Sequence, residues 1–217
     1  MGYLLIIGCI LGQLGYIFFS EKKKFVVALL CKTFASLCFC IIGFINYSAN
    51  NNFANKLIIY GLIFDSIGDV FLGLRNLFAK DLMFVSGSLS FMAGHIFYIL
   101  FFVRSISNYF LYMIIGSIIG LIIYIIIIKI CELKSIYKII GIIYCLMIYI
   151  ICLLGVGLYL ESNIFRNLLM MIGVLLFTCS DTILIVYNFY QKKHWMHPVY
   201  SGLYYIAQIL IALSMGL

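Results

Sequence analysis

Two aspartates lie four positions apart in a segment that otherwise has the composition of a membrane-spanning helix. The segment is LIIYGLIFDSIGDVFLGL, residues 57–74, and the two acids are Asp65 and Asp69. A spacing of four places both on the same helical face. Each is costly in hydrocarbon unless it is paired, protonated or next to a water-filled cavity. Carboxyl groups in such a position transfer protons, either in general acid–base catalysis or in proton-coupled transport.

Four further polar side chains lie inside apolar segments, and they are Asp181, Lys32, His95 and Gln208. A single such group is commonly an interhelical hydrogen bond or a snorkelling side chain. Together with the two acids of residues 57–74, these groups fall in one layer, roughly 8 to 18 Å from the cytoplasmic ends of their helices at ~1.5 Å of rise per residue. This shared depth predicts a polar cavity that opens toward the cytoplasm.

The composition is that of a polytopic membrane protein. Hydrophobic residues make up 66% of the 217 residues and charged residues 10%. Apolar runs of about 20 residues recur with short polar breaks between them, which leaves no room for a soluble domain. We therefore expect an all-α integral membrane protein with one domain over residues 1–217. Its eight predicted transmembrane helices cover residues 3–19, 25–46, 57–74, 82–103, 109–128, 136–158, 167–188 and 198–216.

The 14 lysines and arginines indicate orientation rather than binding of nucleic acid, because they are scattered through short connections. Ten lie in the odd-numbered connections and three in the even-numbered ones, while Lys32 is intramembrane. Since basic residues favour the cytoplasmic side, both termini are predicted to be non-cytoplasmic. The first helix has no basic segment before it and no small-residue cleavage site, so we interpret it as a retained helix. A multi-pass protein of a bacterial inner membrane, or of the endoplasmic reticulum, fits this pattern.

The cysteines and histidines do not predict a metal centre or a disulfide framework. Seven of the eight cysteines lie within predicted helices and Cys131 lies near a connection. Their spacings match no metal site, and they are interpreted as small packing residues. There is no HExxH or histidine-rich motif, so neither a metal nor another cofactor is expected. The sequence does not determine the oligomeric state, and a homodimer stays open.

The two halves of the chain resemble each other. GLIFDSIGDVFL (61–72) and GVLLFTCSDTIL (173–184) both read Gly, seven residues, Asp, two residues, Leu. The spacing of polar residues also matches, with Lys32 37 residues before Asp69, Tyr144 37 before Asp181, His95 26 after Asp69 and Gln208 27 after Asp181. Because four helices separate the equivalents, these similarities predict two parallel four-helix repeats with the site at their interface.

Four segments together resemble the YhhN/TMEM86 family, the lysoplasmalogenases. They are GLIFDSIGDVFLGL (61–74), SFMAGHIFYILFF (90–102), GVLLFTCSDTILIVYNF (173–189) and YYIAQILIALS (204–214). The resemblance implies hydrolysis of the vinyl ether bond of lysoplasmalogen, a 1-alkenyl lysophospholipid held within the bilayer. The products are a fatty aldehyde and a glycerophosphoethanolamine or glycerophosphocholine. The chain would then be an ether hydrolase.

This chemistry needs an acid, because the slow step is proton transfer to the alkene carbon distal to the ether oxygen. Water then captures the resulting oxocarbenium ion, and the hemiacetal collapses to aldehyde and alcohol. A carboxylic acid withdrawn from water can stay protonated near neutral pH, while a second carboxylate stabilises the cation and accepts a proton from water. We expect Asp69 and Asp181 to fill these two roles, in an order that the sequence does not determine.

The remaining polar residues are expected to bind or orient the substrate. Lys32 would pair with the substrate phosphate or keep one aspartate ionised. His95 and Gln208 would orient water or the glycerol hydroxyl, and Asp65, Tyr144 and Tyr205 are further candidates for substrate binding.

Two positions depart from the family pattern. Thr33 follows the lysine of the second helix, where the family often has proline, and Asp65 stands where it usually has a small polar residue. The second departure puts a catalytic role for Asp65 in doubt.

The main alternative is a proton-coupled transporter or lipid flippase, which would use the same midplane acids. The chain is short and its one proline, Pro198, gives little sign of broken helices. A retinal photoreceptor with Lys32 as its Schiff base is disfavoured, since this lysine lies in the second helix and Trp195 lies in a connection.

Overall fold

The computed structural model describes residues 2–78, 81–131 and 135–216, and it is helical throughout. Eight helices are formed there: α1 (Gly2–Glu21), α2 (Phe25–Ala49), α3 (Phe53–Phe78), α4 (Asp81–Ser105), α5 (Tyr109–Ile130), α6 (Ser135–Glu161), α7 (Phe165–Phe189) and α8 (Met196–Ser214). A helix satisfies its backbone hydrogen bonds internally, as hydrocarbon requires. The all-α fold with eight helices is confirmed. Most helices extend past the predicted apolar segments, because they continue through their polar ends.

The chain is a multi-pass integral membrane protein. Helices α1 to α7 are long and apolar enough to cross a membrane, which makes seven candidate spans among the described residues. Helix α8 is not among these spans, and polar side chains on it, Gln208 and Ser214 among them, are buried. Pro198 lies in its first turn, where backbone N–H groups have no partner within the helix, so the proline does not break it. That α8 spans the membrane stays a prediction.

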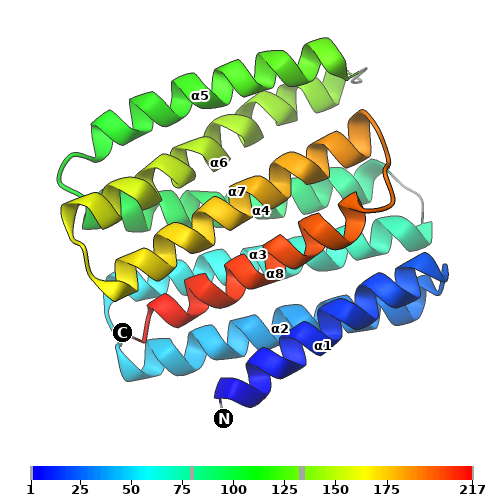
Figure 1. Cartoon of the computed structure of the whole chain (residues 1–217), viewed down its shortest axis with the longest axis horizontal. Helices are drawn as coiled ribbons and strands as arrows, with labels where there is room; N and C mark the ends of the chain where they lie inside the picture. The colour runs from blue at the N-terminus through cyan, green and yellow to red at the C-terminus, as the bar shows by residue number, and fades with distance from the viewer. Residues whose placement is uncertain (1, 79–80, 132–134, 217) are drawn as a thin grey trace.

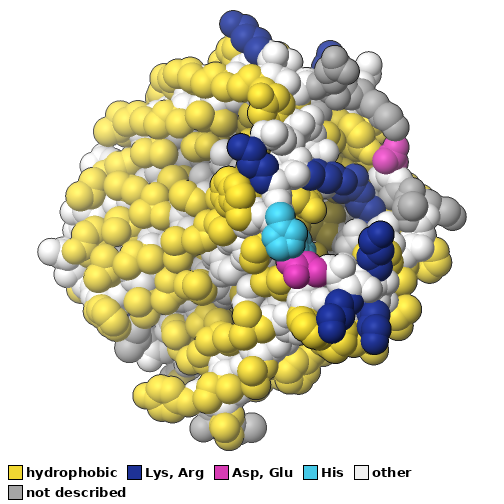
Figure 2. Space-filling view, turned by 45° about the vertical axis from the view of Figure 1, so that its right-hand side comes forward, with side chains coloured by type: hydrophobic (Ala, Val, Ile, Leu, Met, Phe, Trp, Pro, Cys, Tyr) yellow, Lys and Arg dark blue, Asp and Glu magenta, His cyan; other side chains and the backbone are white. Residues whose placement is uncertain are grey.

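The helices lie side by side, with α5 and α1 at opposite edges of the bundle (Figure 1). Helix α5 is held closely against α6 by Gly116 and Gly120, where a Cβ would lie 2.7 Å from the Cα of Ile150 and 2.9 Å from the carbonyl oxygen of Cys145. Small residues four apart allow such close contact in membranes. Hydrophobic side chains cover the flank of the bundle, and charged side chains gather at one end (Figure 2). This distribution suits a helix bundle surrounded by lipid.

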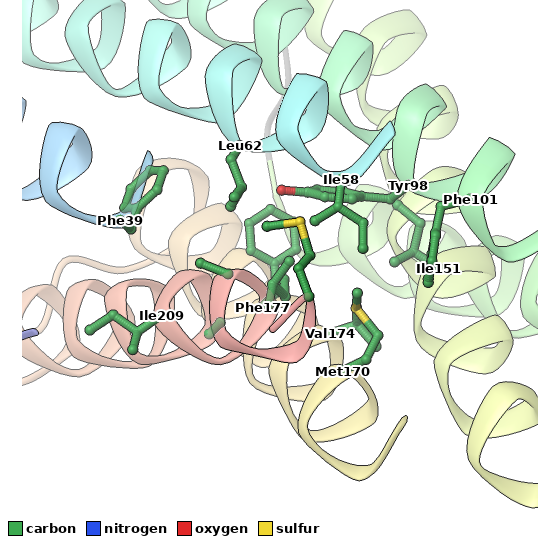
Figure 3. Close-up of a cluster of buried hydrophobic side chains, with 14 of the residues drawn as sticks. Phe39, Ile58, Leu62, Tyr98, Phe101, Ile151, Met170, Val174, Phe177 and Ile209 are labelled. Carbon is green, nitrogen blue, oxygen red and sulfur yellow. The ribbon is translucent and has the colours of Figure 1, made fainter. Parts of the chain in front are cut away.

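A core of apolar side chains fills the interior toward the end that holds the termini. Figure 3 shows part of this core, with Ile58, Phe101, Ile151 and Val174 converging from α3, α4, α6 and α7. The buried acids Asp69 of α3 and Asp181 of α7 lie nearer the opposite end. These two carboxyl groups are therefore separated along the helix axes from the apolar core.

Hydrogen bonds also hold the terminal end together. The Asn55 side chain donates to the carbonyl oxygen of Asn50 at 2.9 Å and accepts from Arg166 at 2.6 Å. It also donates to the carbonyl oxygen of Met215 at 3.2 Å. These bonds join α3 to α7 and to the end of α8.

The two halves pair their helices in the same order. Helix α2 packs on α1 and α3 as α6 packs on α5 and α7, and α3 packs on α4 as α7 packs on α8. In addition, α4 packs on α6 and α8 packs on α2. In both contacts the fourth helix of one half packs on the second helix of the other half, as expected for two parallel repeats. The repeat itself stays a prediction.

Both termini lie toward the same end of the bundle, as do the connections α2–α3, α4–α5 and α6–α7 (Figure 1). The α1–α2 and α7–α8 connections, which are rich in lysine, lie at the other end. We predict that tags at both termini react with a membrane-impermeant label in intact cells, because basic connections favour the cytoplasm. A tag in the α1–α2 turn is the control and should react only after permeabilisation. A C-terminal tag that needs permeabilisation would show that α8 does not span.

Candidate functional site

A cavity of about 540 Å³ opens at the end of the bundle opposite the termini. Its inner wall includes Lys32 of α2, Asp69 of α3 and Asp181 of α7. Its outer part is formed by residues at the ends of α1 and α3 and in the α7–α8 connection, including Glu21, Arg75 and Lys192. Figure 2 shows the hollow at this end, with basic, acidic and histidine side chains around it. The predicted cavity is thus present, at the end where the lysine-rich connections lie.

Lys32 and Asp69 form an ion pair on the cavity wall, with 3.0 Å between Nζ and Oδ1. Their side chains are 9% and 2% exposed, so water screens the pair little. Such a pair in a low-dielectric interior is stable only when its other hydrogen-bonding sites are satisfied.

Hydroxyl groups complete the surroundings of Asp69. Ser36 donates to Oδ2 at 2.6 Å, and Tyr204 donates to the same oxygen at 2.8 Å. Tyr205 lies on the other side of the pair, where its hydroxyl donates to the carbonyl oxygen of Lys32 at 3.2 Å. Asp69 therefore accepts hydrogen bonds from two hydroxyl groups and pairs with one cation, which is the environment of an ionised carboxylate.

Asp181 is bound differently. The Tyr144 hydroxyl of α6 donates a hydrogen bond to its Oδ2. The neighbouring Ser180 donates to the carbonyl oxygen of Tyr200 at 2.8 Å, which links this turn of α7 to α8. The pairs Lys32–Asp69 and Tyr144–Asp181 are those that the equal spacing of 37 residues singles out, and both are in contact.

Asp65 belongs to a separate, closed cluster. Tyr98 of α4 donates to its Oδ2 at 2.9 Å, and Gln208 of α8 donates to the same oxygen at 2.8 Å. The other oxygen, Oδ1, has no hydrogen-bond partner among the described residues. It lies against Gly94, where a Cβ would be 2.6 Å away. Glycine at this position is what allows α4 to approach the carboxyl group.

His95 is fully buried between aromatic rings. Its ring centroid lies 5.2 Å from that of Tyr144 and 5.3 Å from that of Phe177, both edge-on. Neither ring nitrogen has a hydrogen-bond partner in the described part of the chain. His95 thus contacts the residue that binds Asp181 without contributing to the cavity wall.

The expectation of one cavity shared by six polar residues is wrong in part. Lys32, Asp69 and Asp181 line the cavity, as Tyr205 does, whereas Asp65, His95 and Gln208 lie behind its wall. The prediction relied on depth along the helices, and depth does not determine the direction in which a side chain points. Asp65 and Asp69 share a helical face, yet each binds a different set of helices.

Several polar residues of the site were not singled out in the sequence. They are Ser36, Tyr98, Tyr204 and, at the cavity mouth, Arg75 and Lys192. Ser36 is one helical turn after Lys32, a spacing that could have identified it. Tyrosine is too frequent in this chain, with 17 copies, for Tyr98 or Tyr204 to stand out. No group of three His, Cys, Asp or Glu residues that could share a metal ion occurs among the described residues.

The closed cluster makes a prediction about stability. Tyr98→Phe or Gln208→Leu removes one of the two donors to Asp65, and a buried acceptor that loses a partner costs about 1–3 kcal/mol. Each variant should unfold at a lower temperature in detergent, as followed with a thiol-reactive dye, since most cysteines are buried. Tyr190→Phe, at an exposed tyrosine, is the matched control. If Tyr98→Phe unfolds at the same temperature as the control, the cluster contributes no stability.

Comparison with known proteins adds to this geometry. No curated protein and no solved structure matches the chain. The model of the YhhN family matches residues 27–215. This range begins two residues into α2 and includes α3 to α8 in full, whereas α1 lies before it. The matched part contains both cavity aspartates and the lysine of the ion pair. The chain belongs to the YhhN family, which includes lysoplasmalogenases.

Proposed function

We propose that the protein hydrolyses the vinyl ether bond of 1-alkenyl lysophospholipids. The observation that carries this proposal is that two carboxyl groups, Asp69 and Asp181, line one cavity in different chemical environments. Reactions that pass through an oxocarbenium ion use such a pair, one as acid and one as carboxylate. Membership of a family that includes lysoplasmalogenases supports the same reaction.

The hydrogen bonds favour one assignment of roles. Asp69, with Lys32 and two hydroxyls around it, is the carboxylate that stabilises the cation. Lys32 then serves as the counter-ion of Asp69 instead of binding phosphate. Asp181 is the acid, because Tyr144 occupies its Oδ2 and leaves Oδ1 for the substrate.

The reaction then proceeds by proton transfer to the alkene, addition of water and collapse of the hemiacetal. Asp181 transfers its proton to the distal alkene carbon, and the oxocarbenium ion forms opposite Asp69. Water adds to the carbon that bears the ether oxygen and returns a proton to Asp181. The hemiacetal finally breaks its bond to the glycerol oxygen, which takes the hydroxyl proton, and releases the aldehyde.

The cavity mouth suits the phosphate of such a lipid. Arg75 and Lys192 line it, and Arg75 is positioned by its hydrogen bond to Oδ1 of Asn188 at 2.8 Å and by the Phe84 ring, 4.5 Å away. Arginine and lysine both bind phosphate. The headgroup would lie here at the membrane surface, with the ether bond deeper, near the aspartates.

Asp65, His95 and Gln208 act in this proposal as positioning residues. They lie behind the cavity wall, and His95 supports the ring of Tyr144. Tyr144 and Tyr205 border the aspartates and can contact the substrate.

The first functional prediction concerns bond selectivity. Purified protein should release aldehyde from alkenyl lysolipid and no fatty acid from the acyl analogue, because ester cleavage normally calls for an activated nucleophile or metal-bound water. Both products are measured by mass spectrometry. Comparable acyl hydrolysis would overturn the mechanism. Movement of lipid across vesicles without hydrolysis would favour the flippase.

The second functional prediction concerns the two carboxyl groups. Asp69→Asn and Asp181→Asn should each lower turnover by ~10² or more, and the double variant should be little worse than either, because residues that act as a unit are non-additive. Asp65→Ser, one helical turn away from Asp69, is the matched control and should lose roughly tenfold at most. Each variant is first shown to be monodisperse in detergent. Near-normal turnover of Asp69→Asn with an inactive Asp65→Ser would move the catalytic carboxylate to Asp65.

A further inference from the structure

An apolar groove adjoins the cavity on the side of α5 and α6. We call it the apolar groove; its walls include Phe84, Ile127, Ile140, Gly141, Cys145 and Ile185. It encloses about 60 Å³, far less than the cavity, and none of the residues that line it carries a formal charge. A groove of this kind excludes ions and headgroups and accepts hydrocarbon.

The groove and the cavity share walls. Leu72, Phe84, Phe91, Leu184 and Asn188 line both. Tyr144 stands at the junction, because its side chain lines the groove while its hydroxyl binds Asp181 on the cavity wall. The groove and the cavity are therefore neighbours, and Tyr144 and Asp181 lie where they meet.

We propose that the apolar groove holds the hydrocarbon chain of the substrate next to the bond that is cleaved. This inference rests on the proposed function. A 1-alkenyl lysolipid has a charged headgroup, one chain and a vinyl ether at their junction. With the phosphate at Arg75 and the chain in the groove, the alkene carbon lies at the boundary that Tyr144 and Asp181 mark. Apolar walls around the alkene also exclude water from it until the proton is transferred.

The size of the groove limits what it recognises. At about 60 Å³ it takes the first few carbons of the chain, and the rest would leave along α5, which lines the groove and lies at one edge of the bundle (Figure 1). The outer face of α5 is exposed and apolar, with Leu121, Ile122 and Ile126 on the surface. The distal chain then stays in contact with the bilayer.

Gly141 is the residue that we expect to determine how much chain is accepted. Among the described residues, a Cβ at this position would meet only the ring of Tyr124, at 3.7 Å, so the glycine leaves open space in the groove wall. A large side chain would occupy that space without a clash between helix backbones. Gly141→Phe should therefore fill the groove and leave the polar cavity unchanged.

The test compares two substrates with the same headgroup, one with an ethenyl group, which has no carbon beyond the alkene, and one with a hexadecenyl chain. Gly141→Phe should lower the ratio of kcat/KM for the long over the short chain by roughly tenfold or more, the size of effect expected for methylene groups in an apolar pocket. Ile143→Phe, at a residue of α6 exposed on the outer face, is the matched control and should keep the ratio. An unchanged ratio in Gly141→Phe, whatever its turnover, would overturn the proposal.

A second measurement does not depend on hydrolysis. A non-hydrolysable 1-alkyl lysolipid with a diazirine on the chain, close to glycerol, is photolysed with the native protein, and labelled residues are mapped by mass spectrometry. Label is expected at Ile127, Ile140 or Cys145, and less of it in Gly141→Phe. Label confined to outward-facing residues would overturn the groove assignment. If the protein cleaves neither alkenyl lipid, the proposed function fails, and this labelling still decides whether the groove holds a chain.

Discussion

A lysine and an aspartate inside a membrane helix bundle must be paired, because each charge alone costs several kcal/mol in hydrocarbon. Lys32 and Asp69 meet this requirement at 3.0 Å, with Ser36 and Tyr204 supplying further hydrogen bonds. These partners come from α2, α3 and α8, so the pair fixes how these three helices are arranged. Removing either charge would leave the other buried and unpaired, which costs more than the pair contributes.

The surroundings of the pair follow from the same constraint. Lys32, Asp69 and Asp181 line the cavity near the open end, and apolar side chains form a core toward the termini. Asp65 lies between the two regions and is bound by Tyr98 and Gln208 instead of by water. Two carboxyl groups four residues apart on α3 therefore have different surroundings, one open to ligand and one closed.

Much of this arrangement could be predicted from the sequence. Hydropathy placed all eight helices, since a backbone in hydrocarbon has few alternatives to a helix. The equal spacing of 37 residues indicated which side chains meet, and both Lys32–Asp69 and Tyr144–Asp181 are in contact. What the sequence could not supply was the rotation of each helix about its axis. This rotation, set by packing at positions such as Gly94, turns His95 and Gln208 away from the cavity.

The difference between the two ends of the bundle has an energetic consequence. At the terminal end, Asn55 and Arg166 are hydrogen-bonded and the apolar core lies beneath them, whereas the cavity opens toward the opposite end. A reaction whose water and protons enter and leave through this one opening transfers no net charge across the bilayer in a complete cycle. A proton-coupled carrier does transfer charge across it, and is therefore driven by the transmembrane potential.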